Sequence, residues 1–544
     1  MCQLMRRPLC RSLPKCICQF FCKYSETKCS DPGLIQSDIT WTPSMDYHLR
    51  KSSPEAYKKL RKIAKTFSRS TAVGSFIELT AQEHKANQII MKAKKAEYST
   101  GILDPEKFAP GYHIFQALPK INESALFKIL AKMPKGGALT THDTSMCSTE
   151  YLIQLTYREN LWVCTRKEGC KVVAFRFSKE KPTIKAYREC NWEPMEALRE
   201  RRGDENVRKY LNRRFSMYPL GSFSSNNEAW RHFMHIFDLV DGLVQYAPIW
   251  GEYFYNAMKE FLADNVQYME VRTLLPQLYC LDGTLLPVSE TVQIYKDQIN
   301  KFVKDHPNFI GAKLIYAPLR NVDRAGVAKY VKTCSELNEQ FPDVLVGFDL
   351  VGQEDVGLPL VDFVEELVKM PTRVKFYFHA GQTNWSGSEV DANLVDAVLL
   401  GTKRIGHGYA VTKHPLIMAL AKYLDICIEV CPISNQVLQL GQDIRSHPAS
   451  LLYARNVPII ISSGSPSYWH AAPLSHDMYM AFLGIAPINA DLKFLKRVAK
   501  NSIAYSTLSD EEKSIAFLKW KEMWNKWIDD IVKNEGSEHK ESVK

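Results

Sequence analysis

A repeated alternation between short apolar runs and longer helical stretches, beginning near residue 126, constrains the fold of this chain more than any other feature. Such an alternation is typical of parallel strands joined by helices, in a closed barrel or a doubly wound sheet. There are eight runs, which favours an α/β chain folded as a (β/α)8 barrel, or TIM barrel. The predicted strands span residues 137–142, 266–272, 309–316, 344–349, 374–379, 404–407, 426–431 and 457–462.

Polar residues gather at the carboxyl ends of these strands, where (β/α)8 barrels carry their chemistry. His142, His379 and His407 each end a predicted strand, and Ser465 follows the last one. Neutral imidazoles together with a carboxylate can hold Zn²⁺ and lower the pKa of a bound water. The pattern therefore points to a metal-assisted hydrolase, with hydrogen-bonded core histidines as the alternative interpretation.

The remaining segments divide the chain further. Leu60, Ile63 and Phe67 recur at helical spacing, which predicts a helical unit ahead of the barrel. More than 120 residues separate the first predicted strand from the second, which predicts an inserted subdomain. The expected regions are a basic segment over residues 1–45, a helical unit over residues 46–125, the barrel over residues 126–535 with its insertion over residues 150–225, and a charged tail over residues 536–544.

The insertion contains three cysteines, Cys164, Cys170 and Cys190. A bond between Cys164 and Cys190 would close a loop of about 26 residues and stabilise the fold by about 3 kcal/mol in an oxidising compartment. In a reducing compartment the same residues would be three free thiols. Their spacing alone does not decide between the two.

The N-terminal segment is basic and rich in cysteine. Residues 1–70 carry a net charge of +9 out of +10 for the whole chain, so the barrel is nearly neutral. This distribution indicates a solvated basic arm and argues against a nucleic-acid groove. Six cysteines lie among the first 29 residues, around a short apolar patch that resembles a degenerate signal peptide without a cleavage site. No apolar run is long enough for a membrane span.

Several strings in the chain, taken together and in order, closely resemble the adenosine deaminase growth factor family, the secreted proteins similar to adenosine deaminase type 2. The resemblance extends from about residue 54 to about residue 530. The strings are Met133-Pro-Lys-Gly-Gly137, Tyr268-Met-Glu-Val-Arg272, Gly347-Phe-Asp-Leu-Val-Gly352, His379-Ala-Gly381, Arg404-Ile-Gly-His-Gly408, Glu429-Val-Cys-Pro-Ile-Ser-Asn-Gln436 and Ile461-Ser-Ser463.

This resemblance implies a zinc-dependent conversion of adenosine to inosine and ammonia. It also implies an N-terminal dimerisation domain, a disulfide-bearing insertion that binds receptors, and an extracellular location. A homodimer or a heterodimer with an active relative, and a cell-surface receptor or glycan, are the partners expected from it.

The metal ligands match the family only in part. The family has His-x-His at the end of the first strand, where this chain has Thr140 and His142, so one ligand is lost and one is retained. His379 matches the next ligand. An Asp-Asp pair supplies the last ligand and a catalytic carboxylate, and here Gly464 and Ser465 stand in its place. Zinc binding is therefore expected to be weak or absent.

The proton-transfer groups match in part as well. The family's general acid is a glutamate, and this chain has Gln382, whose amide cannot deliver a proton. His407 matches the histidine that positions and deprotonates the attacking water. Asp143 is a candidate replacement ligand, but strand alternation predicts that it points away from the barrel mouth.

Four further residues are candidates for ligand recognition or for glycosylation. Trp230 resembles the aromatic wall of the family's nucleoside pocket, and Gly352 matches a backbone contact, although a purely structural Trp230 is the alternative. Asn122 and Asn384 begin Asn-x-Ser sequons, which carry glycans only in a secreted chain. A glycan on Asn384 would crowd the barrel mouth.

These observations favour a barrel that has lost, or nearly lost, catalysis and acts by binding a nucleoside, a receptor or an active relative. The first alternative is an active zinc-dependent deaminase with a rearranged metal site. A hydrolase acting through Ser465 and His407 on a different substrate is the second, and the spacing of these residues does not support a triad.

Overall fold

The computed structural model describes residues 53–166, 171–187, 189–218 and 223–541. Residues 67–544 form one compact unit and residues 1–66 another, of which only the beginning of helix α3 (Pro54–Ser70) is described. The N-terminal cysteine cluster and Cys170 lie outside the described residues. Among the described residues, no helix is both long enough and apolar enough to cross a membrane.

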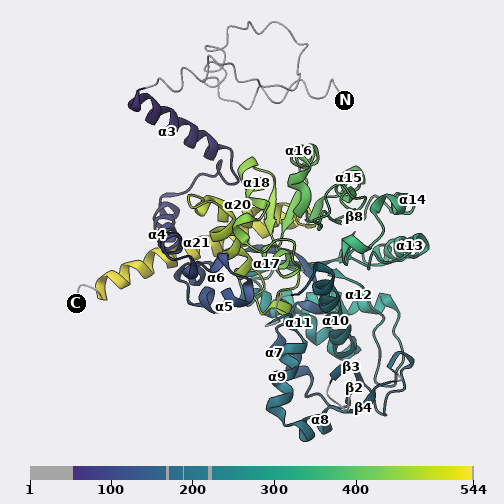
Figure 1. Cartoon of the computed structure of the whole chain (residues 1–544). Helices are drawn as coiled ribbons and strands as arrows, with labels where there is room; N and C mark the ends of the chain where they lie inside the picture. The colour runs from purple at the N-terminus through teal and green to yellow at the C-terminus, as the bar shows by residue number, and fades with distance from the viewer. Residues whose placement is uncertain (1–52, 167–170, 188, 219–222, 542–544) are drawn as a thin grey trace. The chain divides into compact units, whose positions relative to one another are not determined.

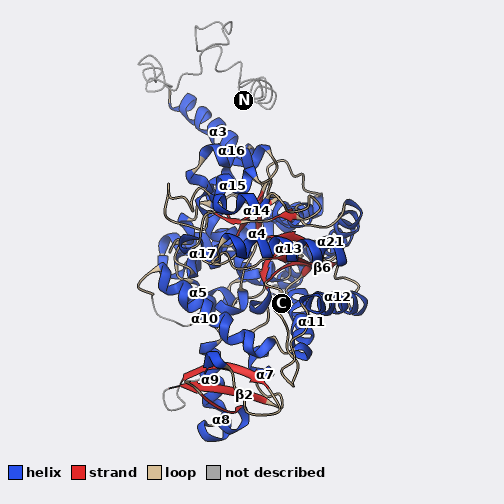
Figure 2. Ribbon diagram, turned by 90° about the vertical axis from the view of Figure 1, so that its right-hand side faces the viewer, coloured by secondary structure: helices blue, strands red, loops and turns tan. Residues whose placement is uncertain are grey.

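All eight predicted barrel strands are present and parallel (Figures 1 and 2). They hydrogen-bond in the order β1-β5-β6-β7-β8 and β9-β10-β11-β12. The predicted strand at 374–379 is interrupted after Phe376 and forms β8 and β9. The strands are β1 (Gly136–His142), β5 (Val266–Thr273), β6 (Gly311–Tyr316), β7 (Leu345–Phe348), β8 (Lys375–Phe376), β9 (His379–Ala380), β10 (Arg404–His407), β11 (Cys427–Val430) and β12 (Ile459–Ile461).

The first and last strands meet at a seam just beyond the end of β12. Thr141 pairs with Gly464 in a parallel bridge. The His142 N–H donates to the Gly464 carbonyl over 3.1 Å, and the Gly464 N–H donates to the Thr140 carbonyl over 3.1 Å. These main-chain bonds close the barrel, so the seam does not depend on the side chains of its residues. The expected (β/α)8 architecture is confirmed.

Burial explains why these segments become strands. Every residue of β5, β10, β11 and β12 is buried, as expected for parallel strands covered by helices on the outside and by side chains within. The helices that connect and cover the strands are α10 (Asn226–Val244), α11 (Ala247–Ala263), α12 (Val288–Asp305), α13 (Arg324–Gln340), α14 (Val364–Leu367), α15 (Asn393–Leu399), α16 (Pro415–Tyr423), α17 (Pro432–Val437), α18 (Ala449–Arg455), α19 (Ser475–Tyr479) and α20 (Leu492–Ala504).

The helical unit predicted ahead of the barrel contains helix α3 and, after it, helix α4 (Ala81–Leu103). Helix α4 begins at a capping box in which the Thr80 side chain accepts from the Glu83 N–H and Glu83 accepts from the Thr80 N–H. Glu83 also accepts a hydrogen bond from the Trp524 indole over 2.7 Å, which joins α4 to α21 (Asp510–Glu541). The short helices α5 (Ile114–Glu123) and α6 (Ala125–Ala131) then lead into β1.

The insertion between β1 and β5 contains its own antiparallel sheet, in the order β3-β2-β4. A disulfide joins Cys164 on β2 to Cys190, next to β4, which confirms this pairing. Cys164 packs with the buried Ala174 and Trp192. The elements of the insertion are α7 (Thr149–Leu155), β2 (Leu161–Arg166), β3 (Lys171–Phe177), β4 (Asn191–Pro194), α8 (Met195–Arg202) and α9 (Asp204–Arg214).

Candidate functional site

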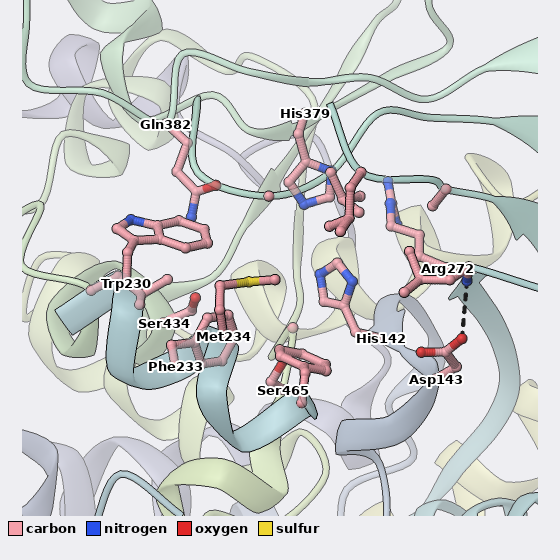
Figure 3. A pocket seen from close by; sticks show the side chains of 18 of the residues that line it. His142, Asp143, Trp230, Phe233, Met234, Arg272, His379, Gln382, Ser434 and Ser465 are labelled. Atoms are coloured by element: carbon pink, nitrogen blue, oxygen red, sulfur yellow. Dashed lines mark hydrogen bonds between the residues drawn. The ribbon is translucent and has the colours of Figure 1, made fainter. Parts of the chain in front are cut away.

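A cavity of about 830 Å³, measured with the space at its opening, lies at the carboxyl ends of the barrel strands (Figure 3). Its lining includes most of the residues singled out in the sequence. Those brought together are His142, Trp230, Gly352, His379, Gln382, His407, Gly464 and Ser465.

Three histidines form the polar end of the cavity. The ring of His379 lies 5.5 Å from the ring of His142 and 5.2 Å from that of His407, measured between centroids. Figure 3 shows the rings of His142 and His379 facing each other. Burial, with the neighbouring His379 and Arg272, lowers the pKa of His142 to about 3. Burial likewise lowers the pKa of His407, so both rings are neutral at physiological pH.

His379 is held by a carboxylate beneath it. The Nδ1 atom of His379 lies 2.6 Å from Oδ2 of Asp349, and the His379 N–H donates to Oδ1 of the same residue over 2.8 Å. Arg272 donates to Oδ2 of Asp349 over 2.7 Å. The partners His379 and Arg272 hold the pKa of Asp349 well below its ordinary value, against the effect of burial. The ring is thus oriented as a ligating histidine would be.

Thr140, at the position of a lost ligand, belongs to the barrel interior instead. Its hydroxyl donates to Oε2 of Glu429 over 2.6 Å. Glu429 also accepts from Arg272 over 2.7 Å and from Arg404 over 2.6 Å. All four side chains are fully or almost fully buried. Thr140 therefore completes an ion network below the cavity, and its oxygen is not free for a ligand.

Gly464 and Ser465, where the resemblance predicts two carboxylates, offer groups that bind metal poorly. Gly464 has no side chain, and its φ of +71° places it in the left-handed region. A Cβ atom at this position would come no closer than 3.8 Å to any other atom, at Oγ of Ser434, so a side chain has room there. Ser465 is 1% exposed and lines the cavity, and it offers a neutral hydroxyl there.

The donor set does not fit zinc. Structural and catalytic zinc sites use three or four His, Cys or carboxylate ligands. In the described part of the chain, no group of three or more His, Cys, Asp or Glu side chains is placed to hold a metal ion. His142 and His379 are the imidazoles at the positions where the resemblance predicts ligands, and a neutral serine hydroxyl does not replace a carboxylate.

Asp143 does not point away from the cavity, contrary to the sequence-based prediction. Strand β1 ends at His142, and residues 143–145 form a 3₁₀ turn, so strand alternation no longer applies. Asp143 lines the cavity, but its carboxylate accepts the N–H groups of Thr144 over 2.9 Å and Leu274 over 3.0 Å. Burial raises its pKa to about 6. Its oxygens serve the turn rather than a metal.

Gln382 lies on a loop whose main-chain N–H groups are hydrogen-bonded to a buried carboxylate, that of Glu354. Glu354 accepts the N–H groups of Gly381 over 3.1 Å and Gln382 over 2.6 Å, and the amide of Asn393 donates to it over 2.8 Å. The side chain of Gln382 enters the cavity on the same side as Trp230 (Figure 3). The amide can donate and accept hydrogen bonds, which suits ligand recognition without proton transfer.

Helix α10 supplies an aromatic wall of which the sequence analysis recognised only one residue. Trp230 is 5% exposed and packs edge-to-face on Phe233, with ring centroids 5.6 Å apart. The signal that was missed is the helical spacing of the other residues, at three, four, seven, eight and eleven positions after Trp230. Those residues are Phe233, Met234, Phe237, Asp238 and Asp241.

Both sequon asparagines are exposed. Oδ1 of Asn122 lies 3.3 Å from Nε2 of His476. The side-chain amide of Asn384 donates to the Leu440 carbonyl over 3.1 Å. Trp385, next to Asn384, is 69% exposed. The positions are accessible, and their glycosylation stays a prediction.

Comparisons of the sequence with known families are consistent along most of the chain. The family described as "Adenosine deaminase" matches residues 215–518, and that described as "Adenosine/AMP deaminase N-terminal" matches residues 39–130. An adenosine deaminase of Lutzomyia longipalpis is 48% identical over 90% of this chain and 96% of its own length. The adenosine deaminase 2 of Homo sapiens is 40% identical over 85% of this chain and 91% of its own length.

Solved structures share the fold at low sequence identity. The N6-mAMP deaminase of Arabidopsis aligns with a TM-score of 0.53 and 16% identity, over 73% of this chain and 99% of its own. An adenine deaminase of Arthrobacter aurescens aligns with a TM-score of 0.51 and 16% identity, over 72% of this chain and 99% of its own. An amidohydrolase of Burkholderia ambifaria, solved with bound Zn, gives a TM-score of 0.51 and 16% identity, over 75% and 95% of the two chains.

Proposed function

This chain belongs to the adenosine deaminase family, and we propose that it is a member that binds a purine nucleoside and has lost, or nearly lost, the ability to deaminate it. The family reaction needs a metal-activated water, a proton donor and a carboxylate. Each of these removes a separate part of the barrier, and the loss of one such group alone often costs about a hundredfold in rate.

The observation that carries the proposal is the state of the seam between β1 and the end of β12. The Thr140 hydroxyl is committed to Glu429, and Gly464 offers no ligand. Two imidazoles, His142 and His379, are then the family ligands that face the cavity. Two ligands are too few for a zinc ion that must also activate water.

The cavity still has what a nucleoside requires. Trp230 and Phe233 offer aromatic faces for a purine, and Gln382 offers both a donor and an acceptor. Gly352 has a φ of +102° and leaves its backbone accessible at the cavity wall. Trp230 and Phe233 come from helix α10 rather than from the strand ends that carry the metal-ligand positions, so the aromatic wall can be retained while those positions change.

We further propose that the protein acts outside the cell. The Cys164–Cys190 disulfide is of a kind that persists in oxidising compartments, and the exposed sequons at Asn122 and Asn384 fit the same location. The insertion and the N-terminal helices are then available for a receptor, a glycan or a second subunit, either another copy or an active relative. A mobility shift on removal of N-glycans from the secreted protein would support this location, and retention of the chain inside the cell would contradict it.

The decisive experiment combines elemental analysis, calorimetry with adenosine and an absorbance assay for inosine in excess zinc. We expect no stoichiometric zinc, no turnover and measurable nucleoside binding. One zinc per chain with clear inosine formation would overturn the proposal and establish an active enzyme with a rearranged metal site. No binding of any nucleoside would leave a scaffold whose role lies in its partners.

A restored variant tests the cause. Thr140→His, Gln382→Glu, Gly464→Asp and Ser465→Asp together should bring back zinc and raise turnover at least about a hundredfold. The matched control carries the first two substitutions with Gly464→Asn and Ser465→Asn, which have the same size without carboxylates. Position 464 can accept either residue, because Asp and Asn tolerate the left-handed region better than other side chains.

A further inference from the structure

A chain of hydrogen bonds that the family reaction does not explain ends at one ring nitrogen of His407. It leaves the other ring nitrogen unbonded within the described residues. The Nδ1 atom of His407 lies 2.9 Å from the side-chain nitrogen of Asn435, which is on helix α17. Because an amide nitrogen can only donate, Nδ1 of His407 must accept. The assignment therefore depends on which way the Asn435 amide is turned.

A second histidine determines the orientation of that amide. Oδ1 of Asn435 lies 3.0 Å from Nε2 of His447. The other ring nitrogen, Nδ1 of His447, receives the N–H of Ala449 over 3.1 Å and must accept. In the neutral ring Nε2 then carries the hydrogen and donates to the amide oxygen, which leaves the amide nitrogen for His407. Each member of the chain fixes the next, starting from a main-chain N–H.

The chain is rigid and uncharged. His447 is 6% exposed and packs edge-to-face against Tyr409, with ring centroids 5.2 Å apart, and Asn435 is 1% exposed. Burial lowers the pKa of His447 to about 3. The ring of His447 therefore stays neutral at physiological pH, which is the condition for its fixed tautomer.

The neighbouring His379 is fixed as the opposite tautomer, with its hydrogen on Nδ1. Its Nδ1 lies 2.6 Å from the Asp349 carboxylate, which can only accept, so Nδ1 carries the hydrogen. In the neutral ring, Nε2 of His379 is then an acceptor, whereas the remaining nitrogen of His407 is a donor. The two rings lie 5.2 Å apart, between centroids, at the same end of the cavity.

We propose that Asn435 and His447 are positioning residues that fix His407 as its Nε2–H tautomer, so that the cavity presents a permanent N–H donor beside the nitrogen acceptor of His379. A ligand edge with adjacent acceptor and donor atoms matches this pair, and the base of a purine nucleoside has such an edge. The match to a nucleoside rests on the proposed function, whereas the tautomer does not.

The tautomer is tested directly by ¹⁵N nuclear magnetic resonance of the histidine-labelled whole chain, since protonated and unprotonated ring nitrogens resonate in separate regions. The resonances that disappear in His407→Gln identify the ring. We expect an unprotonated Nδ1 and a protonated Nε2 in the native protein. A protonated Nδ1 would overturn the proposal, whether or not any nucleoside binds.

Asn435→Asp provides the matching perturbation. A carboxylate of the same shape can only accept, so it should draw the hydrogen of His407 to Nδ1 and turn Nε2 into an acceptor. His447→Phe is the second variant: it releases the amide and should give a mixture of tautomers. An unchanged His407 spectrum in both folded variants would contradict the proposal. Asn338→Asp is the control, because it adds the same charge on α13, where Arg373 already donates over 2.6 Å.

The same variants separate the tautomer from the proposed binding. Adenosine affinity, measured by calorimetry, should fall about tenfold in Asn435→Asp and stay unchanged in Asn338→Asp, because a ligand hydrogen bond is lost only in the first. A reversed tautomer with unchanged affinity would overturn the ligand-facing role of His407. If the native chain binds no nucleoside, the proposed function fails while the spectroscopic result still decides the tautomer.

Discussion

The two halves of the barrel mouth differ in what supports them. At β9 and β10, His379 and His407 are each held by a buried partner, Asp349 and Asn435. At the seam between β1 and Gly464, the barrel is closed by main-chain hydrogen bonds, and the side chains there are small or neutral. The first half is therefore held by buried side chains, and the second half by the backbone.

The comparison teaches that side chains at a strand end can be replaced with little loss in the free energy of unfolding when the backbone makes the local contacts. A change of side chain at residue 464 or 465 leaves the main-chain hydrogen bonds of the seam intact. Loss of a partner below His379 would leave a buried charge unpaired, which is costly. Stability measurements on single variants can break or sharpen this contrast.

The largest effect is expected for Asp349→Ala. This change leaves the buried Arg272 with one carboxylate partner fewer and removes the acceptor of His379. We expect the free energy of unfolding to fall by about 3–5 kcal/mol, the usual cost of breaking a buried pair. Urea unfolding measures it, and a loss below about 1 kcal/mol would show that the retained half is not held as the geometry indicates.

An intermediate effect is expected for Thr140→Val. The substitution keeps the shape but removes the hydroxyl that donates to Glu429 over 2.6 Å. Hydrogen bonds to charged groups contribute about 1.5–3 kcal/mol, and two arginines still pair with Glu429, so we expect the lower end of that range. Calorimetric melting of the variant beside Thr141→Val, whose buried hydroxyl donates to the neutral Glu270 carbonyl over 2.9 Å, would separate this bond from a general effect of threonine replacement.

The dependence of stability on pH should come in part from His447. Its folded pKa of about 3 lies below the ordinary value of about 6.5. The unfolded state therefore binds the proton first, and stability is lost as the pH falls from about 6.5 toward 3. Urea unfolding between these limits should give a flatter profile for His447→Phe. Parallel profiles for the two proteins would show that the ring is not buried in its neutral form.

The smallest effect is expected for Ser465→Ala. The seam bonds on either side of Ser465 come from the main chain, so removal of its hydroxyl should change the free energy of unfolding by no more than about 0.5 kcal/mol. A thermal-shift assay is sufficient to detect more. A loss above about 1 kcal/mol would mean that the seam relies on its side chains after all.

Local patterns were enough for the strands and for the chemistry of the mouth. The apolar runs that end in His142, His379 and His407 predicted the barrel and brought the three rings to one end of it. The identities of Thr140 and Gly464 predicted weak or absent zinc binding, which stays a prediction. The pairing of Cys164 with Cys190 was compatible with the spacing, and the fold settled it against free thiols.

Other features depended on contacts between residues far apart in the chain. Strand alternation misplaced Asp143, because the end of β1 is decided by the turn that follows and by the N–H of Leu274. The aromatic wall of α10 was recognised only at Trp230, since a helical stripe reads the same whether it faces a core or a cavity.

The sequence by itself determined the barrel and which ligand types are present, because strand periodicity and residue chemistry are local properties. Only the tertiary structure decided the role of each neutral group. It assigned Thr140 to Glu429, Asp143 to a turn, and Asn435 to the ring of His407. A hydrogen-bond direction depends on every partner along its chain, and those partners come together only in the folded barrel.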